Sequence, residues 1–418
     1  MMLNKKIGLM IIGLNITITA ASAAVIERSN QSIAAFLQRG NYFEAGITVL
    51  DPSVQGKANT AYGGGSLANI AEYYTLPQVA VKIQATDNLS LGFLYDQPFG
   101  ASAAYSIGDP KVMANIGVFY QNTERTQVDI NTENLTFLAG YQPDKNWNIY
   151  AGAAYQSFDM DIKLRGTGFA GRAALGAYNA SLKKDNALGW IVGAAYQIPE
   201  LGRKISLTYR SKIEHDLKTN EYGQSLVLAA EQKNPAAANF NVNSVTALKI
   251  PQSINLELQT ALSKQLAVFG SLRWVNWKDF SIRPKQFGAI SEALGRRGAT
   301  PDNPKGFDLV KYADDQYAVT VGVGYKFNEK WSGNTNVAWD SGAGDPTTTL
   351  GPTNGYWGLG LGLQFSPTPQ YFIAGGLKYL IIGDAEAQTA AMYGTKKSIA
   401  SFKDNHAWGY GLKVGYRF

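Results

Sequence analysis

The chain has 418 residues, of which 45% are hydrophobic and only 17% are charged, whereas soluble domains carry about 25% charged residues. It contains no cysteine, which excludes a disulfide framework, a cysteine-ligated zinc site and a thiol nucleophile. The net charge of +6 is small and scattered along the chain, so a nucleic-acid partner is not expected.

The first 23 residues carry the three parts of an export signal. Lys5 and Lys6 give a positive start, Ile7 to Thr19 is apolar, and Ala21-Ser22-Ala23 is a small-x-small cleavage site. The apolar run is too short for a membrane-spanning helix, which needs about 20 residues. We therefore predict that residues 1–23 are a cleaved signal peptide.

From residue 41 onward the chain reads as a series of strands with period-two alternation. The last strand shows this best, because one face carries glycine or charge at most positions and the other carries only large apolar groups. That apolar face consists of Trp408, Tyr410, Leu412, Val414, Tyr416 and Phe418. Such alternation is typical of a strand that separates lipid from a polar lumen.

The connections between these strands alternate between short and long. Polar turns such as 144–146 and 328–330 join neighbouring strands. The long connections are 57–76, 107–124, 166–186, 221–246, 282–315 and 390–404. We count about fourteen strands, an even number as in bacterial outer-membrane barrels. They start near residues 41, 77, 89, 126, 147, 187, 203, 247, 266, 316, 331, 354, 371 and 406. The prediction is an all-β fold, a transmembrane antiparallel β-barrel over residues 41–418, with a lumen too wide for side chains alone to fill.

Several of these hairpins, in order, resemble the FadL family of outer-membrane transporters of long-chain fatty acids and hydrocarbons. The most specific piece is LTYRS at Leu207 to Ser211, and the resemblance extends to Tyr42–Pro52, Trp274–Phe280 and Ala407–Phe418. The resemblance implies a fourteen-stranded barrel with an N-terminal plug and apolar extracellular loops. It also implies passive uptake of apolar molecules, which leave sideways through an opening in the wall.

The N-terminal segment departs from that family pattern. The family has a longer hatch with an Asn-Pro-Ala motif, whereas only residues 24–40 are available here and Ser29 to Ser32 stands near the place of the motif. Ile33, Phe36 and Leu37 have the spacing of one apolar helix face. We expect a short lumenal plug over residues 24–40, with a frayed periplasmic end as the alternative.

Two further features correspond to functional parts of the family. Proline interrupts the third strand, and a lateral gate is expected at Pro98, Phe99 and Gly100, with an ordinary bulge as the alternative. Two unusually apolar loops are expected to capture the substrate. Their residues are Phe169, Leu175, Tyr178, Leu226, Val227, Leu228 and Phe240.

A fatty acid also needs a cation for its carboxylate. Arg210 and Lys212 are expected to face the lumen, and four more cations fall near positions where the family places basic pocket residues. The six candidates are Lys163, Arg165, Arg210, Lys212, Arg283 and Lys285. The alternative is that they only pair with acidic neighbours such as Glu214 and Asp216.

The sequence therefore predicts passive outer-membrane transport of hydrophobic compounds, first of all long-chain fatty acids and then hydrocarbons. A porin for small hydrophilic solutes and a surface adhesin are the alternatives. Catalysis is not expected, because no motif joins His215 or His406 to a serine or an acid. No cofactor or metal is expected. We expect a monomer surrounded by outer-membrane lipid.

Overall fold

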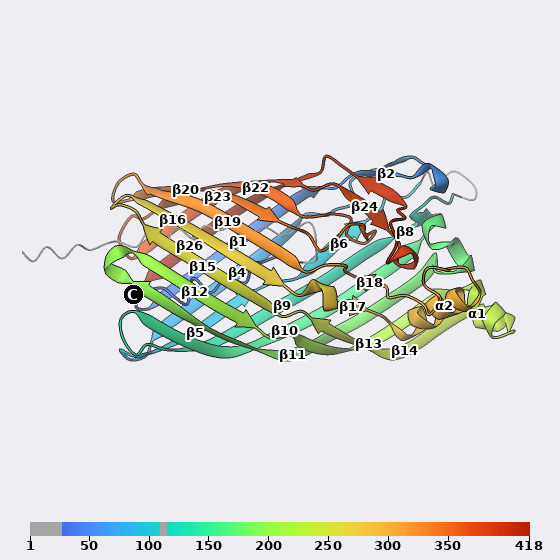
Figure 1. The fold of residues 1–418 in the computed structure, drawn as a ribbon, viewed down its shortest axis with the longest axis horizontal. Helices are drawn as coiled ribbons and strands as arrows, with labels where there is room; N and C mark the ends of the chain where they lie inside the picture. The colour runs from blue at the N-terminus through green and yellow to red at the C-terminus, as the bar shows by residue number, and fades with distance from the viewer. Residues whose placement is uncertain (1–26, 109–114) are drawn as a thin grey trace, which may run out of the picture.

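The computed structural model describes residues 27–108 and 115–418. Most of them form one antiparallel sheet that closes on itself, because β1 (Tyr42–Ser53) pairs with both β4 (Tyr74–Gln84) and β26 (His406–Arg417). The sheet has 17 strand segments, and three wall strands consist of two segments each, which makes a closed barrel of 14 strands. The predicted fold class and strand number are confirmed (Figure 1).

Eight more wall strands are continuous, as β1, β4 and β26 are. They are β9 (Gln127–Tyr141), β10 (Trp147–Arg165), β11 (Ala177–Ile198), β16 (Leu266–Val275), β19 (Gln316–Lys326), β20 (Trp331–Asp340), β22 (Tyr356–Phe365) and β23 (Tyr371–Ile382). The interrupted strands are β5 (Leu89–Asp96) with β6 (Gly100–Ala104), β12 (Arg203–Arg210) with β13 (Ile213–Gln224), and β14 (Asn239–Ile250) with β15 (Ser253–Ala261).

The alternation expected from the sequence sets which side of the wall each residue faces. On β26, Trp408, Tyr410 and Leu412 are 41–54% exposed, whereas Ala407 is buried. Large apolar groups on the exposed face suit contact with lipid, where every backbone polar group must already be paired within the barrel. No helix among the described residues is both long and apolar enough to cross a bilayer.

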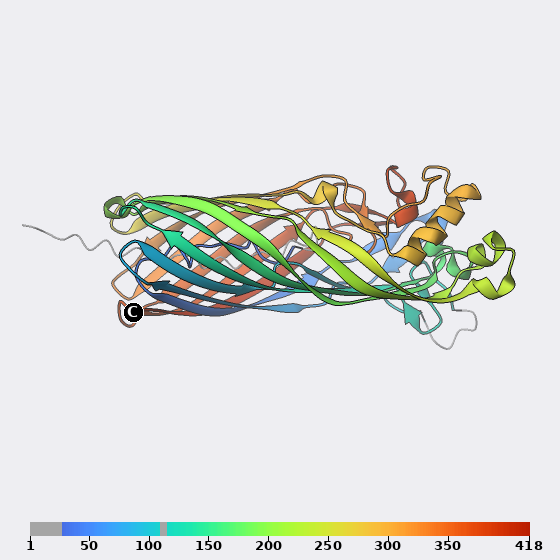
Figure 2. The same cartoon turned by 90° about the horizontal axis from the view of Figure 1, so that it is seen from below.

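The two ends of the barrel differ. Short turns lie at the end that carries the C-terminus, and the helices lie at the opposite end (Figures 1 and 2). These helices are α1 (Leu226–Glu231) and α2 (Lys285–Arg296), and several short strands lie at the same end. These are β2 (Gly56–Ala58), β3 (Ser66–Leu67), β7 (Tyr120–Gln121), β8 (Glu124–Arg125), β17 (Ser281–Ile282), β18 (Val310–Lys311), β21 (Thr347–Thr348), β24 (Ala385–Gln388) and β25 (Ala400–Phe402). By the usual barrel asymmetry this is the extracellular end. We call it the extracellular cap.

Three strands are longer than the sequence pattern predicted. β10 ends at Arg165, directly before the expected loop, but β11 begins at Ala177, so the loop expected over 166–186 shrinks to 166–176. The loop expected over 221–246 likewise shrinks to 225–238, because β13 and β14 extend into it. The outward residues of these extensions are largely polar. The alternation of apolar outward and polar inward residues that marks a lipid-facing strand is therefore lost.

Candidate transport pathway

The third wall strand is broken where the sequence places its proline. β5 ends at Asp96, β6 begins at Gly100, and both segments pair with β9. On the other flank, β4 pairs with β5 only as far as the Val79–Tyr95 pair. The chain ahead of β4 meets β6 again through a single bridge between Ala71 and Ala103. Because Pro98 has no N–H to donate, the sheet cannot simply continue through this point.

An apolar cavity of about 90 Å³ lies directly inside this unpaired stretch. Its lining comes from strands on both sides of the break and from the extracellular cap, and includes Leu50, Tyr74, Ala101, Val128, Ile130 and Leu350. A cavity with this lining suits an apolar ligand, since such sites are mostly hydrophobic with a few polar groups.

The N-terminal segment is bound to the broken strand from the lumen side. The Pro98 carbonyl accepts hydrogen bonds from the backbone N–H of Arg28 at 2.6 Å and of Ser29 at 3.2 Å. The Ser29 hydroxyl donates to Asp96 Oδ2 at 2.5 Å, and Glu27 forms a β-bridge with Phe99. The backbone groups freed by the break are thus partly satisfied by the segment, as buried backbone groups require.

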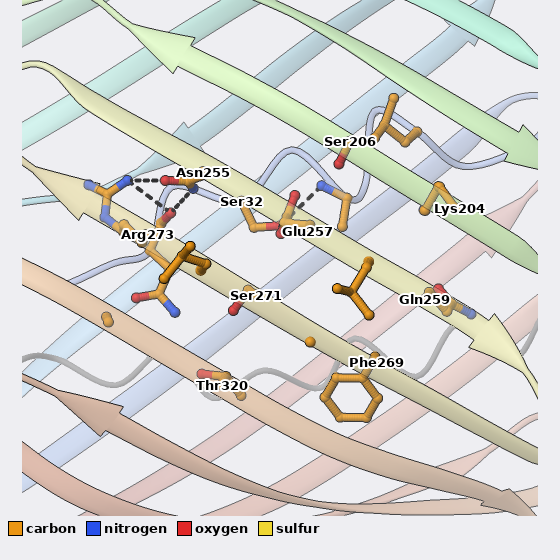
Figure 3. Close-up of a pocket in the computed structure, with 17 residues that line it drawn as sticks. Ser32, Lys204, Ser206, Asn255, Glu257, Gln259, Phe269, Ser271, Arg273 and Thr320 are labelled. Atoms are coloured by element: carbon orange, nitrogen blue, oxygen red, sulfur yellow. Dashed lines mark hydrogen bonds between the residues drawn. The ribbon is translucent and has the colours of Figure 1, made fainter.

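The same segment is bound to the opposite part of the wall, on β15 and β16. The Arg273 guanidinium forms a buried ion pair with Glu27 and donates to Gln31 Oε1 at 3.0 Å. The Ser32 hydroxyl donates to Glu257 Oε1 at 2.5 Å. Ser32, Glu257 and Arg273 line a small, more polar cavity of about 50 Å³ (Figure 3). The segment therefore crosses the lumen and is tied at both sides.

The three apolar residues singled out in this segment are all buried. Ile33, Phe36 and Leu37 are 1–7% exposed. Phe36 packs edge-on against Tyr150 at 5.8 Å between ring centroids, and a Cβ at Gly92 would overlap its ring. They sit on a single turn, closed by a 3.3 Å hydrogen bond from Leu37 N to Ile33 O, not on a full helix. That residues 24–40 form a lumenal plug stays a prediction, and the contacts of residues 27–40 with the wall support it. The predicted signal peptide lies outside the described residues.

Comparison with known proteins agrees with this geometry. The family model described as "Outer membrane protein transport protein (OMPP1/FadL/TodX)" matches residues 16–418. The chain belongs to this family. It is therefore an outer-membrane transport protein and not an enzyme, as the sequence predicted.

Individual relatives of this FadL/TodX family member are distant in sequence. The long-chain fatty acid transport protein of Salmonella typhi is 22% identical over 406 residues, which cover 90% of this chain and 84% of the relative. A FadL homologue from Pseudomonas aeruginosa has 15% identity and a TM-score of 0.66, with 92% of each chain covered. The toluene transporter TodX of Pseudomonas putida has 12% identity and a TM-score of 0.62, covering 96% of this chain and 93% of its own. At such identities the solved structures support the fold.

Two of the cations predicted to bind a carboxylate are buried and already have acceptors. Arg165 donates to both carboxylate oxygens of Glu124, at 2.9 and 3.2 Å, and to Asn179 Oδ1 at 2.7 Å. The hydrogen bond from Arg165 holds the pKa of the Glu124 carboxyl below its ordinary value. Arg210 donates from Nη2 to the Gln31 carbonyl at 3.0 Å. Both arginines thus join protein segments to each other.

The other four candidates are exposed or only partly buried. The expectation that Lys212 faces the lumen is wrong, because its side chain is 58% exposed and pairs with Glu214 at 2.8 Å. The strand break at 211–212 resets the alternation, and the next residue, Ile213, is the buried one. Arg283 pairs with Glu292 and Asp308 in the extracellular cap. Lys163 is partly buried and Lys285 is exposed. None of the six lines the apolar cavity.

The residues predicted to form exposed capture loops are mostly covered. Phe169, Leu175, Tyr178 and Leu228 are buried by 93% or more, while Val227 and Phe240 are partly buried and pack against the same hydrophobic core. Only Leu226, at 53% exposure, is exposed. These loops fold inward and pack into the hydrophobic core at the mouth of the barrel. Capture of substrate by these residues stays a prediction.

Sequence reasoning missed Glu27, Arg28 and Arg273. Glu27 and Arg273 are 246 residues apart and only meet through closure of the barrel. The one available signal was the charged pair Glu27-Arg28 directly ahead of the apolar residues of a segment expected in the lumen. A charged pair in such a place must find partners or bind a ligand.

Proposed function

We propose that this chain carries hydrophobic compounds passively across the outer membrane, and that long-chain fatty acids are its main substrates. The substrate enters the apolar cavity from the extracellular side and leaves between β4 and β6 into the bilayer. The observation that carries this proposal is the apolar cavity that lies directly behind an unpaired stretch of wall. The relatives' names, a long-chain fatty acid transport protein and a toluene transporter, support the substrate class.

A hydrophilic porin is the competing interpretation, and it is disfavoured by the segment that crosses the lumen. A fourteen-stranded barrel is wide enough for a water-filled channel unless something occupies it. Here residues 27–40 occupy it through hydrogen bonds, an ion pair and apolar packing. We infer that ion conductance is low and that solutes do not pass straight down the axis.

The test is to staple the edge of the wall break with a disulfide. Because the chain has no cysteine, Ala71→Cys and Ala103→Cys together would give it two cysteines and no others. Ala71 and Ala103 already face each other as a β-bridge. Thr320→Cys with Ala338→Cys is the matched control, since it joins two strands that pair without interruption from Ala318–Asp340 to Lys326–Ser332. Uptake of a labelled long-chain fatty acid and single-channel conductance are measured in liposomes and planar bilayers.

We expect the variant with Ala71→Cys and Ala103→Cys to lose most uptake when oxidised and to recover it on reduction. The control variant should behave as the native chain does. Equal uptake in the oxidised and reduced forms would contradict lateral release at this break. Steady conductance without fatty-acid uptake in the native chain would contradict the whole proposal and favour a porin.

A further inference from the structure

Seven arginines and lysines among the described residues are buried almost completely, and they fall into two groups. Five have a carboxylate, carbonyl or amide oxygen as acceptor: Lys82, Arg165, Arg210, Arg273 and Lys413. The remaining two, Arg28 and Lys378, contact an aromatic ring and have no ion pair within the described part of the chain. Of these two, only Arg28 packs against residues that line the apolar cavity.

Arg28 occupies the break in the wall. Its guanidinium carbon lies 4.4 Å from the centroid of the Tyr74 ring on β4. On the other side it packs against Gly100 of β6, where a Cβ would overlap the guanidinium. Both residues line the apolar cavity, and their strands are the two that do not pair at this height. The guanidinium thus lies at the point where a molecule leaving the cavity would pass.

One nitrogen of the guanidinium has no hydrogen-bond partner in this position within the described part of the chain. Arg28 is 6% exposed, and its Nε is buried without a hydrogen-bond partner among the described residues. The nearby Glu27 is already paired with Arg273. Asp129 of β9 attracts the guanidinium electrostatically, but no ion pair joins the two within the described residues. A buried arginine without an ion-pair partner carries a desolvation cost that is only partly compensated, and a planar fork of donors matches a carboxylate. The contact with Tyr74 offsets part of that cost, because a cation over an aromatic face is attracted to it.

We propose that Arg28 binds the carboxylate of a fatty acid while its alkyl chain occupies the apolar cavity. This assignment rests on the transport of hydrophobic compounds proposed above. When the carboxylate binds, the Arg28 guanidinium exchanges its contact with the Tyr74 ring for charge-assisted hydrogen bonds at the wall break. Neutral apolar molecules gain nothing from Arg28, so the chain discriminates acids from neutral compounds of the same length.

The experiment compares oleate with oleyl alcohol, which share an alkyl chain and differ in the charge of the head group. Half-saturating concentrations for uptake into liposomes are measured for the native chain, Arg28→Gln, Arg28→Lys and Arg39→Gln. Arg39 is the matched control, because it is an exposed arginine of the same segment. Resistance of the unheated protein to unfolding in detergent shows that each variant has a folded barrel.

For Arg28→Gln we expect the half-saturating oleate concentration to rise about tenfold, the size of one lost charge-assisted pair. Oleyl alcohol should be unaffected, Arg28→Lys should recover part of the loss, and Arg39→Gln should match the native chain. If oleate and oleyl alcohol change equally, or oleate does not change, the assignment to Arg28 is overturned while transport stands. If the native chain takes up neither compound, both proposals are overturned.

Discussion

The buried ion pair between Glu27 and Arg273 should decide whether the N-terminal segment stays in the lumen. Glu27 is 1% exposed and Arg273 is 3% exposed. Arg273 also donates to Gln31 Oε1 and to Asn255 Oδ1, at 3.0 and 2.6 Å. Arg273→Met would leave the Glu27 carboxylate buried without a cation, which costs about 3–5 kcal/mol. The equilibrium between the docked and undocked segment should therefore shift by about a hundredfold to several thousandfold.

Single-channel conductance reports this shift, because an unoccupied barrel of this width conducts ions. We expect frequent open events for Arg273→Met, and fewer for the double variant Glu27→Gln with Arg273→Met, in which no charge is left unpaired. Arg203→Met, at an exposed arginine of β12, is the matched control. If Arg273→Met conducts no more than the native chain while its barrel remains folded, the ion pair does not hold the segment. Equal conductance of the single and double variants would also refute the reasoning.

Three further predictions concern other parts of the chain. Pro98→Val gives the third strand a donor and a side chain that favours strands, so fatty-acid uptake should fall several-fold; unchanged uptake would exclude the break as the route. Glu221→Ala removes the carboxylate that accepts two first-turn amides of α2, at 2.8 and 2.7 Å, and should cost about 1–3 kcal/mol locally. Hydrogen exchange in α2 should accelerate, whereas Glu329→Ala, in an exposed turn, should leave it unchanged. The hydrogen bond from Arg165 lowers the pKa of Glu124 and stabilises the β7–β8 hairpin when the pH is above the ordinary carboxyl pKa. This stabilisation is lost as the pH falls through the lowered pKa of Glu124. Pepsin should therefore cut the hairpin faster as the pH drops below about 4, and Arg165→Met should abolish that dependence.

The barrel wall could be predicted because lipid imposes a strict local rule. Outward residues must be apolar and the chain must reverse within a few polar residues, so both signals are visible within one hairpin. The rule fails where lipid is absent. The outer part of β11 carries exposed polar groups such as Lys183 and Lys184, so it reads as loop.

The site was less predictable because its contacts are not local. Lys212 was expected on the lumenal face by counting from Arg210, but the break at 211–212 changes which residue points inward. Whether a basic residue is free or paired also depends on partners from distant strands. Arg165 is paired with Glu124, 41 residues away, and this cannot be read from spacing.

The extracellular cap has one shared hydrophobic core, and this limits how its outer surface can vary. Tyr105, Phe287 and Phe402 come from loops far apart in the chain, yet all belong to the same cluster of buried side chains. Changing one loop alone would leave a void against the others. Exchange of loops between relatives must therefore involve several loops together. A foreign peptide would be tolerated best in the exposed turn after α2, at residues 297–299, which lies outside that core.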